Sequence, residues 1–153
     1  MDAFNHNIET ARLSGLNARQ LLVPYTIGLL ILLASLHTVI AIEGGGPSSV
    51  VAVSGLVLVA VYYAAFYLLK SSILNKIRFG QLVVHAITYV FVIGSYQLHA
   101  ALITLSGSSA LLGNADFAVA SNWFGPTFAM AGFWAIGFAV HAVASVAQRG
   151  FED

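Results

Sequence analysis

The sequence predicts an all-α integral membrane protein, a bundle of four transmembrane helices. Of its 153 residues, 59% are hydrophobic and only 8% are charged, whereas soluble domains carry about 25% charged residues. So few charges cannot cover a surface that faces water. The composition therefore excludes a water-soluble globule and a disordered chain. The formal net charge of zero gives no sign of a nucleic-acid partner.

Four apolar stretches are long enough to cross a bilayer, which takes about 20 residues per helix. They cover approximately residues 21–42, 49–69, 81–105 and 126–147. The glycine-rich turn 43–47 ends the first stretch, and Pro126 fits the first turn of the last one. Residues 1–20 form a polar segment that we expect to lie on the membrane surface. Residues 148–153 are a short tail.

The basic residues predict the orientation of the four spans. Two precede the first span, three lie between the second and third, and one follows the fourth: Arg12, Arg19, Lys70, Lys76, Arg78 and Arg149. Lys and Arg collect on the cytoplasmic side of membrane proteins. We therefore expect both termini in the cytoplasm, loops 43–48 and 106–125 on the outside, and a bacterial inner membrane as the location.

Aromatic residues near the ends of the spans fit the belts that mark membrane–water boundaries. Trp123 and Phe124 would belong to the outer belt, and Tyr62, Tyr63 and Tyr67 to the inner one. The second span has no ionisable side chain except its tyrosines. Its predicted role is packing, or lining a quinone groove that opens to the lipid.

Several classes of chemistry are excluded by what the sequence lacks. It has no cysteine, which removes disulfides, thiol catalysis and iron–sulfur clusters. It has no phosphate-binding loop, no serine-nucleophile elbow and no zinc-protease motif. No carboxylate lies inside a span, so proton-coupled transport lacks its usual carrier.

Four histidines lie inside the predicted spans, where ionisable side chains are costly and generally functional. At a rise of about 1.5 Å per residue, His37 and His99 both lie about 8–9 Å below the outer boundary. His85 and His141 lie within about 3 Å of each other in depth, near the cytoplasmic side. The histidines thus form an outer pair and an inner pair.

His85 and His99 are fourteen residues apart, which places them on one helix face about 21 Å apart. One helix with two ligands, and two further helices with one each, can hold two haems across a membrane. The sequence therefore predicts haem b held by two axial imidazoles, from His85 and His141, with a second haem on His37 and His99. One haem or two stays open.

This layout resembles the di-haem b-type membrane cytochromes, including the cytochrome b561-like anchor subunits of hydrogenases and formate dehydrogenases. The resemblance covers a histidine spacing and a topology. It implies an electron-transfer subunit, possible oxidoreductase chemistry, and exchange of electrons with quinone or a redox partner subunit.

Other residues would support a haem. Gly94 and Gly137 would let the flat macrocycle approach the backbone. Arg78 and Arg149 lie at the level of the inner propionates, whereas the outer side has no Lys or Arg. Hydroxyls within a turn of a histidine could orient it, but in membrane helices such groups mostly bond the carbonyl four residues earlier. They are Ser35, Thr38, Thr88 and Ser95.

The C-terminal half also resembles the bacterial 2TM-domain family, a hairpin of two membrane helices. The resemblance is carried by residues 85–89 (HAITY), 122–126 (NWFGP) and 133–142 (FWAIGFAVHA). It implies the pairing of His85 with His141 and says nothing about redox chemistry. Ala135 stands where that family usually has glycine, the loop is longer, and two helices precede the hairpin.

Two alternative functions stay open. One is a non-redox scaffold like the 2TM domains, as a subunit of a larger complex or as a homo-oligomer. The other is a subunit whose histidines bind a chlorophyll-type pigment or copper. A pigment's magnesium needs only one axial histidine, so pairing by depth would then be unnecessary.

Overall fold

The computed structural model describes residues 18–43, 46–77, 79–106 and 121–149. They form four long helices: α2 (Ala18–Glu43), α3 (Val50–Leu74), α4 (Gly80–Leu105) and α6 (Met130–Arg149). A short helix α5 (Ser121–Phe124) and a π-helical turn η1 (Gly125–Ala129) lead into α6. Each long helix, α6 together with the turns before it, is long and apolar enough to span a membrane. The predicted all-helical fold, with four helices of spanning length and composition, is confirmed for the described residues.

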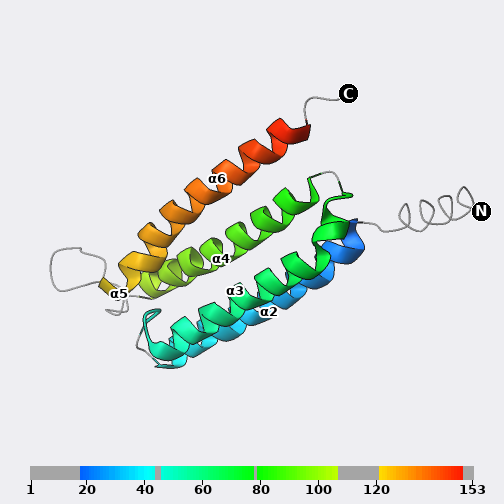
Figure 1. The fold of residues 1–153 in the computed structure, drawn as a ribbon. Helices are drawn as coiled ribbons and strands as arrows, with labels where there is room; N and C mark the ends of the chain where they lie inside the picture. Colours follow the sequence, from blue (N-terminus) through cyan, green and yellow to red (C-terminus); the bar gives the residue numbers. More distant parts are fainter. Residues whose placement is uncertain (1–17, 44–45, 78, 107–120, 150–153) are drawn as a thin grey trace, which may run out of the picture.

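The helix α4 is the centre of the arrangement (Figure 1). It packs against α2 and α3 on one side and against α6 on the other. The helices α2 and α3 lie side by side, and α2 begins at the end of the molecule where α6 ends. Every described side chain of α6 is at least partly exposed, so α6 flanks the packed three-helix unit instead of closing a compact four-helix bundle.

The core is a seam between α2 and α4. In α2 the buried residues recur every three or four positions: Tyr25, Leu29, Leu33, Leu36 and Ile40. The buried positions of α4 follow the same period, with Val84, Thr88, Val92 and Tyr96 among them. This spacing keeps one stripe of each helix turned toward the other. The hydroxyls of Tyr25 and Thr88 lie 2.6 Å apart across the seam.

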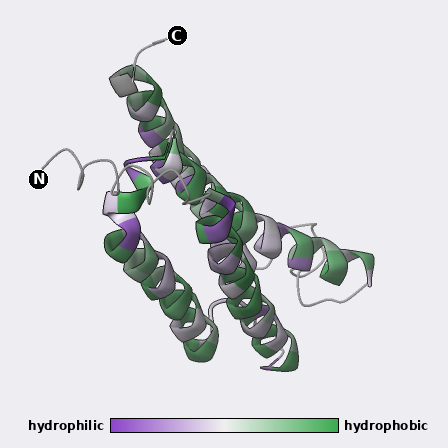
Figure 2. Cartoon of the chain, turned by 90° about the vertical axis from the view of Figure 1, so that its right-hand side faces the viewer, coloured by the Kyte–Doolittle hydropathy of each residue, from purple (hydrophilic) through white to green (hydrophobic). Residues whose placement is uncertain are grey.

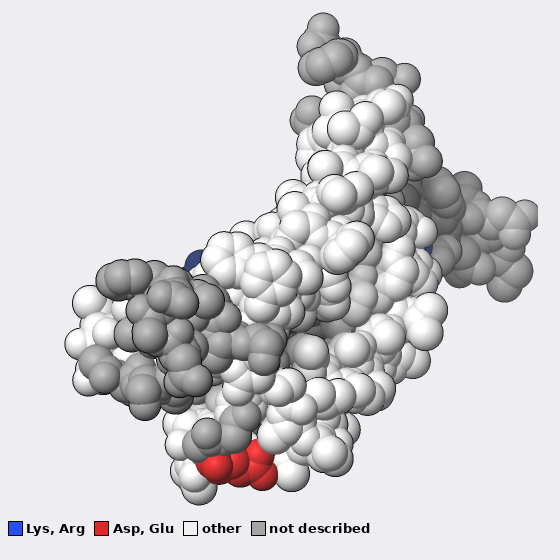
Figure 3. Space-filling view, turned by 90° about the vertical axis from the view of Figure 1, so that its left-hand side faces the viewer, with Lys and Arg blue, Asp and Glu red and all other residues white. Residues whose placement is uncertain are grey.

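The outward faces of the helices are also apolar (Figure 2). Ile31 is 61% exposed, Leu58 62% and Phe133 76%. In the space-filling view, charged side chains take up very little of the visible surface (Figure 3). A helix that is hydrophobic all round needs an apolar solvent. These faces therefore fit contact with lipid.

The turns between helices are fixed by local contacts. Ser49 caps α3: its hydroxyl accepts a hydrogen bond from the Ala52 N–H and donates one to the Glu43 carboxylate. The sequence placed the end of this span at residue 69, but α3 continues to Leu74. Hydropathy marks only the apolar part of a helix. The backbone hydrogen bonds of α3 continue beyond that part, through Lys70 and the two serines that follow.

Most of the aromatic residues predicted for the boundary belts point inward. Trp123 is only 1% exposed, whereas Phe124 is 57% exposed. The Tyr62 hydroxyl donates to the Tyr25 carbonyl oxygen, and the Tyr67 hydroxyl donates to Gln81. The tyrosine rings pack between the helices because their hydroxyls find hydrogen-bond partners there.

Candidate functional site

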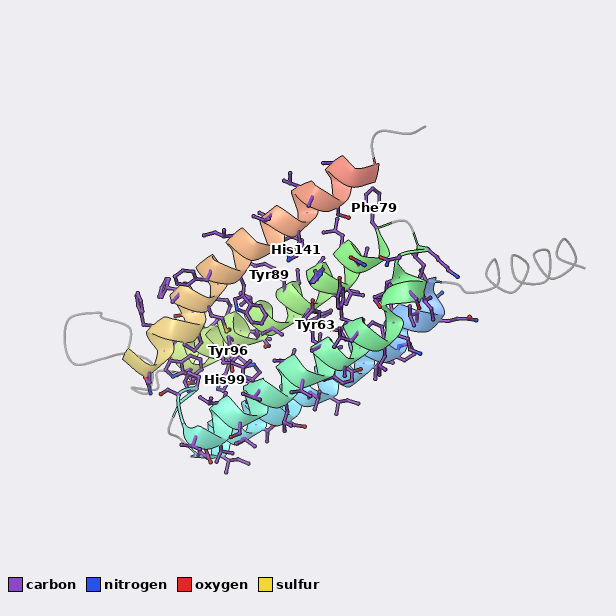
Figure 4. All side chains as sticks on the ribbon, in the orientation of Figure 1. Tyr63, Phe79, Tyr89, Tyr96, His99 and His141 are labelled. Atoms are coloured by element: carbon purple, nitrogen blue, oxygen red, sulfur yellow. The ribbon has the colours of Figure 1, made fainter. Side chains whose placement is uncertain are left out.

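The His37/His99 pair joins α2 to α4. The two Nδ1 atoms are 2.9 Å apart, a hydrogen-bond distance. The ring planes meet at 73° with centroids 5.1 Å apart. The ring of Tyr96 meets His37 edge-on, and the indole of Trp123 meets His99 edge-on. Figure 4 shows Tyr96 and His99 near the end of α4 that leads toward α5.

A cavity of about 700 Å³, the α2/α4 cavity, borders this pair. Its walls are almost entirely apolar, with Leu33, Phe91 and Leu98 among them, and both histidines line it. Gly94 lines it too, and a Cβ at that position would meet no heavy atom within 4 Å. Cofactor sites usually have about 300–1,000 Å³ and apolar walls with few polar groups. The α2/α4 cavity has these properties.

The His85/His141 pair joins α4 to α6 and has a different geometry. The two rings are stacked, with centroids 5.0 Å apart and planes 11° from parallel. The Tyr63 hydroxyl of α3 lies 2.6 Å from His85 Nδ1. A smaller pocket of about 290 Å³, the α4/α6 pocket, is lined by this pair together with Tyr63, Tyr89 and Gly137. In Figure 4, Tyr89 and His141 lie between α4 and α6.

Neither pair has the geometry of two imidazoles with one iron between them. Metal–imidazole bonds are about 2.0–2.1 Å long, so two ligating nitrogens lie about 4 Å apart across a metal. The His37 and His99 nitrogens are in direct hydrogen-bond contact at 2.9 Å. The rings of His85 and His141 lie face to face, whereas ligation uses a lone pair in the ring plane. The structure brings both predicted pairs together, but the first pair is in direct hydrogen-bond contact and the second is stacked face to face.

The His37/His99 contact does fit a different arrangement, in which one ring binds a metal and the other orients it. A ligating histidine generally donates its second N–H to a hydrogen-bond acceptor. Here one neutral ring must donate from Nδ1, and its Nε2 then keeps a free lone pair. The Nε2 of His37 is buried and has no partner among the described residues, so it does not open on the cavity. His99 is therefore the ring available to a ligand, with His37 as its acceptor.

Of the remaining predicted site residues, the two glycines line one hollow each. Gly94 lines the α2/α4 cavity, and Gly137 lines the α4/α6 pocket. A Cβ added at either glycine would meet no heavy atom within 4 Å. Arg78 lies outside the described residues. Arg149 is the last residue of α6, and its side chain is outside the described part of the chain.

The nearby hydroxyls bond within their own helices. Thr38 donates to the Ala34 carbonyl and Ser35 to the Ile31 carbonyl. Ser95 donates to the Val92 carbonyl and Thr88 to the Val84 carbonyl. The expectation that they bond local carbonyls rather than the histidines is confirmed.

Three residues of these sites were not singled out as partners of a histidine: Tyr63, Tyr96 and Trp123. Tyr63 and Trp123 were assigned to the boundary belts because of their positions near span ends. Tyr96 lies one turn before His99, a spacing that places both side chains on the helix face that meets His37 of α2. That spacing was the available signal. The contact of Tyr63 with His85 depends on helix packing and has no local signature.

A scan against family models and searches of curated proteins and of solved structures found no match to this chain. Within the described ranges, no group of three or more His, Cys, Asp or Glu side chains could hold a metal ion. A metal that arrives in a macrocycle already has four ring nitrogens and needs only one axial imidazole.

Proposed function

We propose that the protein is a membrane b-type cytochrome that binds one haem in the α2/α4 cavity, with His99 as axial ligand. The observation that carries this proposal is the His99–His37 hydrogen bond of 2.9 Å at the wall of an apolar cavity of about 700 Å³. When bound, the haem would supply a one-electron couple, and the protein would move electrons across or within the membrane. The partner in exchange would be quinone or a redox subunit.

The chain's own residues would do four things. His37 would accept the Nδ1 hydrogen of His99 and so hold the Nε2 lone pair toward the ligand. Trp123, edge-on to His99 at a centroid distance of 5.2 Å, would limit rotation of the imidazole. Gly94 would leave room for the macrocycle beside the backbone, and the apolar walls would exclude water.

Filling the cavity tests the proposal without touching a histidine. A leucine at Gly94 has room to extend into the α2/α4 cavity. We expect Gly94→Leu, produced with added haem and purified in detergent, to lose most of its reduced-minus-oxidised absorption. Gly132→Leu is the matched control, because a side chain there also meets no atom within 4 Å and Gly132 does not line the cavity. Equal haem content in both variants would contradict the assigned site.

A second candidate is a non-redox membrane subunit whose histidines fasten helices together. The specific observation in its favour is that the two histidines of each pair are in direct contact with each other. The α2/α4 cavity also has no Lys or Arg in its lining to pair with propionates. On this account the purified protein is colourless, and histidine substitutions lower stability alone.

We propose that both termini face the cytoplasm, in a bacterial inner membrane. The support is the distribution of basic residues along the sequence, together with the start of α2 and the end of α6 at one end of the molecule (Figure 1). The chain has no cysteine, so single cysteines can report topology. A membrane-impermeant maleimide should label Ser48→Cys in intact cells and Lys76→Cys only after permeabilisation. The reverse labelling pattern would show that the protein has the opposite orientation in the membrane.

A further inference from the structure

The α4/α6 pocket differs from the α2/α4 cavity in its walls. Five of its nine lining residues are aromatic: Tyr63, Tyr89, Phe133, Trp134 and Phe138. The rings of Tyr89 and Phe138 are stacked, 8° from parallel with centroids 5.4 Å apart. The stacked imidazoles of His85 and His141 add two more flat surfaces. Such walls favour a flat ring over a flexible acyl chain.

The pocket also has hydrogen-bond donors to spare. The Tyr63 hydroxyl carries one hydrogen, and the ring of neutral His85 carries one hydrogen on a nitrogen. The contact of 2.6 Å between the two side chains uses only one of these hydrogens. One donor therefore remains in either tautomer. His141 is exposed, and its nitrogens have no hydrogen-bond partner among the described residues. An acyl chain would leave these donors unused, whereas a carbonyl oxygen would accept from them.

The pocket is flanked by apolar surface, as expected where a helix faces lipid. It lies between α4 and α6, and α6 exposes large apolar side chains along its length, including Ile136 at 66% and Val140 at 63%. A ligand would therefore enter from the lipid. The volume of the α4/α6 pocket, about 290 Å³, lies at the lower limit for common cofactor sites. A single substituted ring fits that size better than a macrocycle does.

We infer that the α4/α6 pocket binds the head group of a membrane-soluble quinone, with His85, His141 and Tyr63 as hydrogen-bonding residues. The aromatic walls contact the ring, the donors meet a carbonyl oxygen, and the isoprenoid tail lies in the lipid beside α6. This assigns His85 and His141 a role other than haem ligation. It deepens the proposed function by locating its quinone partner, although quinone binding itself does not require that a haem be present.

The test uses a short-chain ubiquinone analogue and the protein's own tryptophans. Trp134 lines the pocket, so a bound quinone should quench tryptophan emission saturably in lipid nanodiscs. A leucine at Gly137 has room to fill the pocket. We expect Gly137→Leu to weaken binding about tenfold or more, and Gly132→Leu to leave it unchanged. Tyr63→Phe, which removes only the hydroxyl, should weaken binding a few-fold.

Two outcomes would overturn the inference: no saturable quenching in the wild-type protein, or equal affinity in Gly137→Leu and Gly132→Leu. Helical content measured by circular dichroism verifies that each variant is folded. Haem absorption of the same samples separates this inference from the proposed function. A colourless protein that still binds quinone refutes only the haem assignment, while a haem-containing protein with no saturable quinone binding refutes only the pocket assignment.

Discussion

Replacing His99 with alanine should remove about nine-tenths or more of the haem absorption from the purified protein, because in the proposed site the axial bond would hold the cofactor in place. His37→Ala should weaken haem binding about 10–100-fold, since it removes only the acceptor that orients the ligand. The measurement is haem content per chain, from the reduced-minus-oxidised spectrum at matched protein concentration.

His141→Ala is the control, because this ring does not line the α2/α4 cavity. It should keep the wild-type haem content. Added imidazole should restore part of the absorption of His99→Ala by entering the space that the side chain leaves. Loss of haem in His141→Ala but not in His99→Ala would move the cofactor to the α4/α6 pocket.

The largest effect on stability is expected at Gly80, the first residue of α4, which follows the turn from α3. A Cβ there would collide with the backbone carbonyl oxygen of Leu74 and lie 3.1 Å from the Ile77 Cβ. The Gly80 N–H also donates to the Ile77 carbonyl at 2.9 Å, so the turn cannot shift freely. We expect Gly80→Ala to lower the free energy of unfolding by about 1–3 kcal/mol.

This effect can be measured by unfolding the protein with SDS in mixed micelles. Gly132→Ala is the matched control, because its Cβ would meet no atom within 4 Å. It should be neutral or stabilising by up to about 1 kcal/mol, since alanine is the better helix former. If Gly80→Ala were as stable as Gly132→Ala, the tight approach of the turn to Leu74 would be refuted.

The spans and the grouping of the histidines could be predicted because both follow from the position of residues along the sequence. Hydropathy locates a helix in lipid, and a fixed rise per residue converts sequence position into depth. Depth alone placed His37 with His99 and His85 with His141, and the structure brings the rings of each couple into contact.

Contact geometry could not be predicted, because it depends on how each helix turns about its axis and on side-chain rotamers. The sequence predicted a metal between the rings, but the His37 and His99 nitrogens form a hydrogen bond. It also placed Trp123 at a boundary, where the apolar sequence around it gave no sign of its contact with His99. The two hollows lie beside Gly94 and Gly137, where an added Cβ would meet no heavy atom within 4 Å, and such open space depends on how the helices pack.

The most direct test of the account is the absorption spectrum of the wild-type protein, produced with a haem supply and recorded before and after dithionite. The account predicts a b-type difference spectrum with about one haem per chain, since the α2/α4 cavity, unlike the α4/α6 pocket, has a volume well inside the range of cofactor sites. Two haems per chain would contradict the assignment of the α4/α6 pocket to quinone. A fully folded, colourless protein would contradict the cytochrome itself.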